Sequence, residues 1–226
     1  MEKQPGTSKE QALAVHRALI QRYGQRPWQP RLDPVGELIS TILSQNTNDV
    51  NRDRAYEQLR QRFSNWEAVR DADPDELEET IRIAGLANSK GPAIQRALRQ
   101  ISAERGEISL DFLEDRPLDE ARHWLTNLNG VGPKTAAIVL LFSFNRPAFP
   151  VDTHVHRVSQ RLGLIGPKIS REKAHQILEA LLPPETYYAF HLNLIAHGRQ
   201  ICHARQPRCG DCPLLDWCKY GKDVTS

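Results

Sequence analysis

Apolar positions along the chain follow the three-to-four-residue period of helices, and no stretch alternates convincingly between apolar and polar residues. Short connections rich in Gly, Pro and Asn separate the periodic stretches, and no repeat of fixed period is present. The pattern predicts an all-α protein with helices over residues 8–23, 34–43, 49–63, 74–84, 88–105, 117–127, 133–144, 153–162, 171–182 and 184–201.

Two of the predicted helix starts depend on capping residues. Asp49 is expected to cap the helix that ends near residue 63, because a short polar side chain can accept a hydrogen bond from the first turn. Asn88 or Ser89 is expected to start the helix that follows residue 87. Pro92 should then lie in the first turn of that helix, since a proline deeper inside removes a backbone hydrogen bond.

The chain is long enough for one large domain or two small ones, at 226 residues. Residues 1–9 are polar and no apolar signal segment follows them, while the longest apolar run, residues 136–142, is too short to span a bilayer. We therefore expect an intracellular, cytoplasmic protein without a membrane partner. In such a reducing location cysteines serve as ligands more often than as disulfides.

Charge is unevenly distributed although the net charge is only +2. Residues 71–80 hold six acids and no base, whereas residues 81–105 hold five bases and one acid. This segregation could form a basic face for phosphate contact. An ordinary set of solvated helix faces explains the same pattern and is the preferred interpretation from charge alone.

A tight turn with the sequence Leu-Asn-Gly-Val-Gly occupies residues 128–132 between two predicted helices. Gly130 and Gly132 permit positive φ and close approach of another backbone, and Pro133 suits a first helical position. Free N–H groups at such a turn and helix start can bind a phosphate without reading bases. An ordinary hairpin of two helices is the alternative, and the turn alone favours it.

Lys134 follows on the first turn of the second helix, where the helix dipole and partial burial oppose its charged form. A neutral lysine is a nucleophile that can form an imine with an aldehyde carbon. Asp152 lies 18 residues further on, directly before another predicted helix. Its carboxylate can cap that helix, or it can accept a proton from a neighbouring lysine.

All four cysteines lie in one array with the spacing C-x6-C-x2-C-x5-C, namely Cys202, Cys209, Cys212 and Cys218. A shell of cysteines suits zinc or an iron–sulfur cluster. Structural zinc usually shows two C-x2-C pairs, and this array has one. Spacing therefore favours a [4Fe–4S] cluster over zinc, and both over disulfides.

Three segments together resemble the helix–hairpin–helix DNA glycosylases (the HhH-GPD superfamily), and within them endonuclease III. They are LNGVGPKTA at 128–136, VDTHVHRV at 151–158 and HGRQICHARQPRCGDCPLLDWC at 197–218, with fainter matches in ILSQNTNDV at 42–50 and GLANSK at 85–90. The resemblance implies a two-domain all-α fold, with a six-helix module at 31–144. Residues 1–30 and 145–226 would form a domain that holds a [4Fe–4S] cluster in a C-terminal loop.

The resemblance also implies a function. The protein would remove oxidised pyrimidines from DNA and cut the resulting abasic site by β-elimination, with Lys134 attacking C1′ and Asp152 as its acidic partner. The implied partner is double-stranded DNA with a damaged base or abasic site, bound by a monomer in the nucleoid. Two alternatives stay open at this point: a glycosylase for mismatched or deaminated bases with weak lyase activity, and a non-catalytic DNA-binding or electron-transfer iron–sulfur protein.

Further DNA contacts carry over by position. Leu86 matches an apolar wedge that fills the gap in the duplex, although a buried core leucine is an equal alternative. Gln45 or Asn46 would enter the same gap, and Asn129 departs from the family, where proline is common. The cluster is expected to shape the loop that presents basic residues. The remaining positions expected to contact DNA are Gly130, Val131, Gly132, Lys90, Arg199, Arg205 and Arg208.

Overall fold

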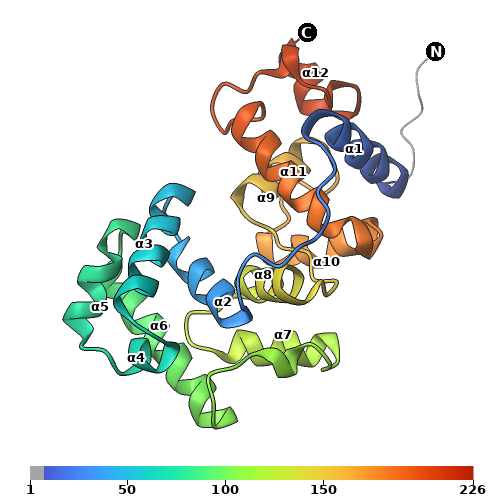
Figure 1. Cartoon of the computed structure of the whole chain (residues 1–226). Helices are drawn as coiled ribbons and strands as arrows, with labels where there is room; N and C mark the ends of the chain where they lie inside the picture. The colour runs from blue at the N-terminus through green and yellow to red at the C-terminus, as the bar shows by residue number, and fades with distance from the viewer. Residues whose placement is uncertain (1–7, 226) are drawn as a thin grey trace. The chain divides into compact units, whose positions relative to one another are not determined.

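The computed structural model describes residues 8–225, and these residues form helices and loops with no strand (Figure 1). The predicted all-α class is therefore confirmed for this part of the chain, while most of the polar segment 1–9 lies outside it. By their internal contacts the residues fall into two compact units, the described part of Met1–Gln29 with Pro147–Ser226, and Pro30–Arg146. No described helix combines the length and apolar character needed to cross a bilayer.

The unit Pro30–Arg146 is built around α2, the most thoroughly buried of its helices. α2 packs against α8, α3 and α6, and α7 completes the unit by packing on α8. Leu38 and Ile42 from α2 and Val139 and Leu140 from α8 are almost fully buried in its core. The helices are α2 (Pro34–Leu43), α3 (Asp49–Arg62), α4 (Trp66–Asp71), α5 (Pro74–Ile81), α6 (Ala87–Arg105), α7 (Leu118–Asn127) and α8 (Pro133–Phe144), with short 3-10 turns η1 (Arg82–Ala84) and η2 (Asp111–Leu113).

The other unit joins the two ends of the chain. α11 packs on both α1 and α9, and its Phe190 is fully buried against Phe149. The amide of Gln11 donates to Leu162 O (2.7 Å) and Trp217 O (3.1 Å), which ties the first helix to the last part of the chain. Its elements are α1 (Ser8–Tyr23), α9 (Thr153–Arg161), α10 (Arg171–Leu181), η3 (Pro184–Thr186), α11 (Tyr187–Gln200), η4 (Cys209–Asp211), η5 (Leu215–Trp217) and α12 (Lys219–Thr225).

Two expected helix starts are wrong in detail. α3 is capped by Asn48, whose Oδ1 accepts from Asn51 N (2.9 Å), and Asp49 instead pairs with Arg52 (3.0 Å). α6 begins at Ala87, one residue earlier than the expected start, and Pro92 is its sixth residue. The hydrogen bond that Pro92 cannot make would go to the carbonyl of Asn88, an exposed residue, and water can take its place.

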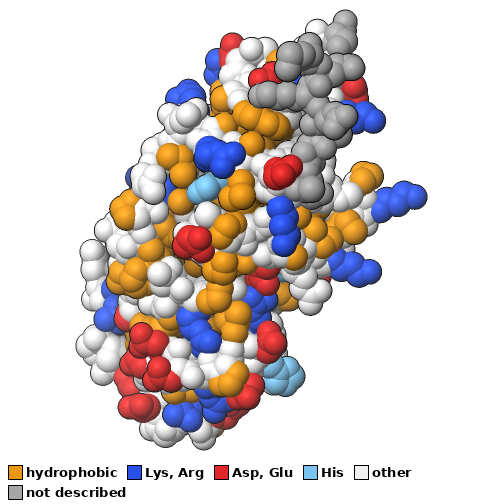
Figure 2. Space-filling view, turned by 90° about the vertical axis from the view of Figure 1, so that its right-hand side faces the viewer, with side chains coloured by type: hydrophobic (Ala, Val, Ile, Leu, Met, Phe, Trp, Pro, Cys, Tyr) orange, Lys and Arg blue, Asp and Glu red, His pale blue; other side chains and the backbone are white. Residues whose placement is uncertain are grey.

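Most of the charged residues at 71–105 are engaged close to their own positions. Arg82 pairs with Glu79, Arg62 pairs with Glu76, and Arg105 lies over the ring of Phe112 (4.1 Å). On the face in Figure 2, Lys and Arg side chains are interspersed with acidic and apolar ones and form no continuous patch. These contacts favour the preferred interpretation from the sequence, that the charges are ordinary helix faces.

Candidate functional site

The predicted hairpin is present, with α7 and α8 joined by residues 128–132. Gly130 has φ +81°, a left-handed conformation that favours glycine, and Gly132 is the N-cap of α8. Gly132 has no side chain to cover the first turn, so the N–H groups of that helix start lie behind an exposed glycine. The turn therefore has the geometry of a backbone anion site.

Val131 was expected to contact DNA, but the turn uses it internally. Its side chain is buried, and its N–H donates to Leu128 O (3.1 Å). That N–H is used inside the turn, so the expected phosphate contact by Val131 is wrong. Val131 holds the hairpin from within, and the glycines on either side of it are exposed.

The hairpin turn is held on α6 by a side chain that the sequence did not single out. Arg96 Nε donates to Asn129 Oδ1 at 2.9 Å. A Cβ added to Gly130 would lie 3.4 Å from the Cβ of Ala93, which shows how closely the turn approaches that helix. Asn129 is thus anchored by a hydrogen bond.

Lys134 is the second residue of α8 and is half-buried. The helix behind it is rigidly placed, because α8 is apolar and packs along α2. Lys134 therefore lies within one turn of the exposed glycines, at the positive end of the α8 dipole. This is the placement that the sequence predicted.

Leu86 is 53% exposed, which excludes the expectation of a buried core leucine. Its φ of +53° and ψ of 34° place a leucine in the left-handed region, where a side chain is unfavourable. It lies directly before α6 with no side-chain cap. An exposed apolar residue in an unfavourable conformation at a loop tip is consistent with a contact made only with a partner.

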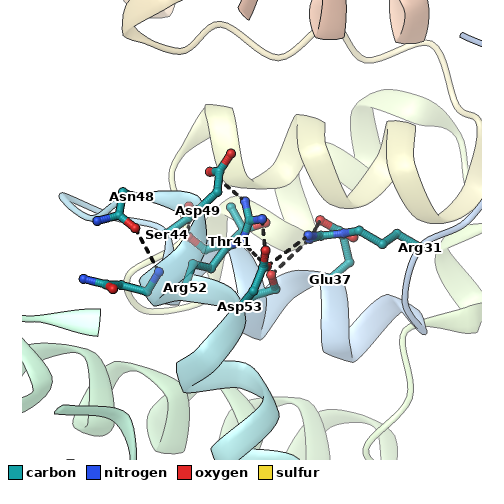
Figure 3. A network of polar contacts seen from close by, with 10 residues as sticks. Arg31, Glu37, Thr41, Ser44, Asn48, Asp49, Arg52 and Asp53 are labelled. Carbon is teal, nitrogen blue, oxygen red and sulfur yellow. Dashed lines mark hydrogen bonds and ion pairs between the residues drawn. The ribbon is translucent and has the colours of Figure 1, made fainter. Parts of the chain in front are cut away.

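Gln45 and Asn46 lie on the loop between α2 and α3, and both are exposed. Asn46, like Leu86, has φ +53°. The loop is framed by polar contacts shown in Figure 3: Ser44 Oγ donates to Thr41 O (2.7 Å), and Arg52 pairs with Asp49 and Asp53. On the same network Arg31 reaches the buried carboxylate of Glu37 (3.0 Å).

The expected phosphate contact by Lys90 is wrong. Lys90 is only 3% exposed, and its ammonium donates to the carbonyls of Leu43 (2.8 Å) and Ala84 (2.7 Å). Burial lowers its pKa below the usual lysine value. The physical reason is its position on the fourth residue of α6, where the side chain points into the unit.

Asp152 caps α9 as expected. Its Oδ1 accepts a hydrogen bond from Val155 N at 2.7 Å, and its backbone is extended. The side chain is partly exposed, so the cap does not remove it from solvent. Neighbouring His154 is partly buried, and burial lowers its pKa below the usual value.

Two residues shortly before Asp152, Phe149 and Pro150, are held by side chains from α10 and α11. His175 donates from Nδ1 to Phe149 O (2.8 Å), and His191 donates from Nδ1 to Pro150 O (2.9 Å). Glu179 accepts from Phe149 N at 2.7 Å. A carbonyl can only accept, so both histidines carry their proton on Nδ1.

α9 is also joined to the cysteine loop at its other end. Arg157 donates to Gly198 O (2.9 Å) and Cys202 O (3.0 Å). Arg161, one helical turn further on, donates to Cys202 Sγ (3.2 Å) and His203 O (2.6 Å). The helix that Asp152 caps therefore holds the first cysteine of the array.

The four cysteines are free thiols within one loop region, and the electrostatic interactions among them show that they lie near one another. Burial raises the pKa of the Cys212 thiol to about 11, with a smaller contribution from the other cysteines. Gly221 N donates to Cys218 Sγ (3.2 Å), and a Cβ on Gly221 would come within 2.9 Å of Leu215 Cδ1. Thiolates here need a strongly positive centre, so the donor set fits a thiolate-bound iron–sulfur cluster.

No group of three or more His, Cys, Asp or Glu among the described residues is arranged to hold a single metal ion. The expected basic residues of this region lie at its surface. Arg205 and Arg199 are exposed, and Arg208 is exposed while paired with Asp211 (2.7 Å).

Comparison with known proteins adds the decisive observation. Residues 39–184 match the HhH-GPD superfamily base excision DNA repair protein model. The chain belongs to the HhH-GPD superfamily. Residues 202–218 of this HhH-GPD protein match the iron-sulfur binding domain of endonuclease III, which confirms the iron–sulfur interpretation of the cysteines over zinc.

This HhH-GPD protein is 35% identical over 188 residues to endonuclease III of Thermotoga maritima, covering 83% of this chain and 84% of that protein. A putative DNA glycosylase of Arabidopsis thaliana is 34% identical over 188 residues; the match covers 79% of this chain but only 64% of that protein. Among solved structures, a trapped endonuclease III–DNA covalent intermediate matches with TM-score 0.84 and 30% identity, covering 96% and 99% of the two chains. The predicted endonuclease III-like fold and repair family are confirmed.

Several supporting residues of the HhH-GPD protein were missed from sequence. A signal existed for Arg157 and Arg161, which are four residues apart and so share one face of α9. Arg96, His175 and His191 gave no local signal, because each makes its contact far away along the chain.

Proposed function

We propose that this protein removes oxidised pyrimidines from double-stranded DNA and then cleaves the strand at the resulting abasic site. The observation that carries the proposal is the position of Lys134, a half-buried residue on the first turn of α8, directly after the exposed glycines of the hairpin. A related protein, endonuclease III, is known as a trapped covalent complex with DNA. A lysine amine is a nucleophile that can form such a bond.

The chemistry follows from that amine. Nζ of Lys134, in its neutral form, attacks C1′ of the damaged nucleotide, and the bond from C1′ to the base breaks as the base leaves with the electron pair. Opening of the sugar ring gives a Schiff base between Nζ and C1′. Loss of a proton from C2′ expels the 3′ phosphate oxygen, which is the β-elimination. Water then hydrolyses the Schiff base and returns the lysine.

Asp152 has a supporting role in this scheme. As the acidic partner that the resemblance implies, its carboxylate would serve as a proton acceptor in the reaction and stabilise the cationic sugar that develops as the base departs. Only Oδ1 is used to cap α9, by accepting from Val155 N. The contacts of Phe149 and Pro150 with His191, His175 and Glu179 fix the backbone that leads to it.

Contacts with the duplex are divided among backbone and side chains. Gly130, Gly132 and the first N–H groups of α8 bind a phosphate beside the lesion. Leu86 and either Gln45 or Asn46 enter the space left by the extruded nucleotide. Extrusion requires a few kcal/mol, least for a damaged base, and these residues offset part of it. Arg199, Arg205 and Arg208 are assigned to other phosphates.

A [4Fe–4S] cluster is assigned to Cys202, Cys209, Cys212 and Cys218. When bound, it would supply the positive centre that these partly buried thiolates require and close the loop that carries Arg205 and Arg208. The protein is proposed to act as an intracellular monomer, with residues 31–144 as the hairpin module. Residues 1–30 and 145–226 would form the cluster domain.

Borohydride trapping tests the mechanism. Borohydride reduces a Schiff base to a stable amine, so the wild-type protein should become covalently linked to a duplex that contains an abasic site or thymine glycol. Lys134→Ala should give no linked product, and Lys134→Arg should behave alike because a guanidinium is not nucleophilic. Lys168→Ala, a change at an exposed lysine, is the matched control.

The outcome is decisive in either direction. Trapping of Lys134→Ala at the wild-type level would show that another amine reacts. Binding without any cleavage by the wild-type protein would instead favour the non-catalytic alternative. A panel of duplexes with oxidised, deaminated and mismatched bases then identifies the lesion, and preference for the latter two would favour the second glycosylase alternative.

A further inference from the structure

Lys90 contacts the C-terminal ends of two separate helical elements in the unit Pro30–Arg146. Its ammonium donates to the carbonyl of Leu43, the last residue of α2 (2.8 Å), and to that of Ala84, the last residue of η1 (2.7 Å). Carbonyls at the ends of helical segments lack a helical partner and carry partial negative charge. A buried cation satisfies both of them at once.

Each of these carbonyls lies at the base of a loop whose tip is exposed. Three residues after Leu43 comes Asn46, and two residues after Ala84 comes Leu86. Both tip residues have φ +53°, an unfavourable region for a residue with a side chain. The backbone N–H of Lys90 also donates to Leu86 O at 2.9 Å. Lys90 therefore contacts both loop bases and one tip.

Packing alone gives no reason for a lysine at this position. Placing an ammonium where only 3% of the residue is exposed requires its removal from water, and burial lowers its pKa accordingly. A methionine would fill a similar volume without that requirement. What the ammonium adds is a fixed geometry, since its two donors join two loops that are far apart in the sequence.

We propose that Lys90 is a positioning residue that holds the Asn46 loop and the Leu86 loop at a fixed spacing, so that both tips enter the extrusion gap in the duplex together. The inference rests on the proposed function and deepens it. Lys90 would thus affect DNA binding through Leu86 and Asn46, and not through the direct phosphate contact that the sequence predicted.

Cleavage of two abasic substrates tests the inference. In a duplex, the tips must fill the gap opposite the unpaired base, whereas a single strand has no gap to fill. Lys90→Met should lower the single-turnover cleavage rate on the abasic duplex about fivefold or more, as expected for coupling of about 1 kcal/mol, and change the single-strand rate less than about twofold. Lys168→Met, at an exposed lysine, should leave both rates unchanged.

A double-mutant cycle separates positioning from general support. If Lys90 acts through Leu86, Lys90→Met should cost much less on the duplex once Leu86→Ala has removed the wedge. Lys90→Gln keeps N–H donors on a shorter side chain and should give an intermediate duplex rate. Circular dichroism and urea unfolding of each variant establish that it is folded.

Three results would overturn the inference. The first is an equal loss of cleavage rate on the duplex and the single strand, and the second is full additivity of the duplex effects of Lys90→Met and Leu86→Ala. The third is failure of both Lys90 variants to fold, which would assign Lys90 a role in folding. A wild-type protein that cleaved neither substrate would instead refute the proposed function, and this inference with it. Normal wild-type cleavage with an unchanged ratio of duplex to single-strand rates in Lys90→Met would refute the positioning role alone.

Discussion

Arg161 donates a hydrogen bond from Nη1 to Sγ of Cys202 at 3.2 Å, and the same nitrogen donates to His203 O. Its other terminal nitrogen donates to Ala204 O at 3.1 Å. One side chain of α9 thus fixes three consecutive residues at the start of the cysteine loop. A hydrogen bond to a cysteine sulfur stabilises its thiolate form, which is the form that binds iron.

Arg161→Leu should therefore weaken retention of the iron–sulfur centre. Each hydrogen bond of a charged donor contributes about 1.5–3 kcal/mol, and three acceptors lose their partner together. We expect lower iron content per protein after purification and faster iron loss to a chelator. Arg171→Leu, at an exposed arginine on α10, is the control. Equal iron retention in the two variants would contradict the role assigned to Arg161.

The Arg96–Asn129 hydrogen bond should stabilise the hairpin turn by a small amount. Both partners are exposed, so we expect a coupling of about 0.5–1 kcal/mol between Arg96→Ala and Asn129→Ala in urea unfolding. Weaker DNA binding should accompany either change, since the turn carries the anion site. Strictly additive effects on unfolding would show that the contact contributes nothing.

Asp152→Asn should separate capping from catalysis. Asparagine caps helices as well as aspartate, so the free energy of unfolding should change by less than about 0.5 kcal/mol. Proton transfer requires the carboxylate, and the glycosylase rate should fall about 100-fold or more. DNA affinity measured on an uncleavable duplex should be nearly unchanged. A variant with the full rate would leave Asp152 with its capping role only.

His16 should make folding sensitive to acid. It is buried against Phe190, and burial, with a lesser effect of Arg17, lowers its pKa below 6.5. The unfolded chain therefore binds a proton more readily than the folded one, so stability is fully present above pH 6.5 and is lost as pH falls through the folded-state pKa. His16→Phe should reduce the fall in urea midpoint between pH 7 and pH 5. Burial also lowers the pKa of His197, to about 4. Because His197 is present in both the wild-type protein and His16→Phe, part of the pH dependence of stability should remain in the variant.

Local sequence determined the helices well. Pro34–Leu43 and Pro133–Phe144 are found as predicted, because a proline marks the first residue of each. The short α4 and α12 were missed, since six or seven residues show too little periodicity. Spacing likewise identified the cysteine array, whose members lie close together along the chain.

Tertiary contacts were beyond that reasoning. Lys90 looked like any exposed basic residue until the carbonyl of Leu43, 47 residues away, was seen to accept from it. The exposure of Leu86 could not be decided either, because a leucine before a helix can face inward or outward depending on the preceding turn. The contacts of His175 and His191 with residues 149 and 150 depend on how α10 and α11 pack.

The conformation of Leu86 implies a trade-off between stability and function. A glycine in its place would adopt the left-handed backbone without the steric cost of a Cβ. The leucine is favourable only when something apolar, such as the stacked faces of bases, surrounds it. Selection for thermal resistance alone would therefore be expected to discard this side chain first.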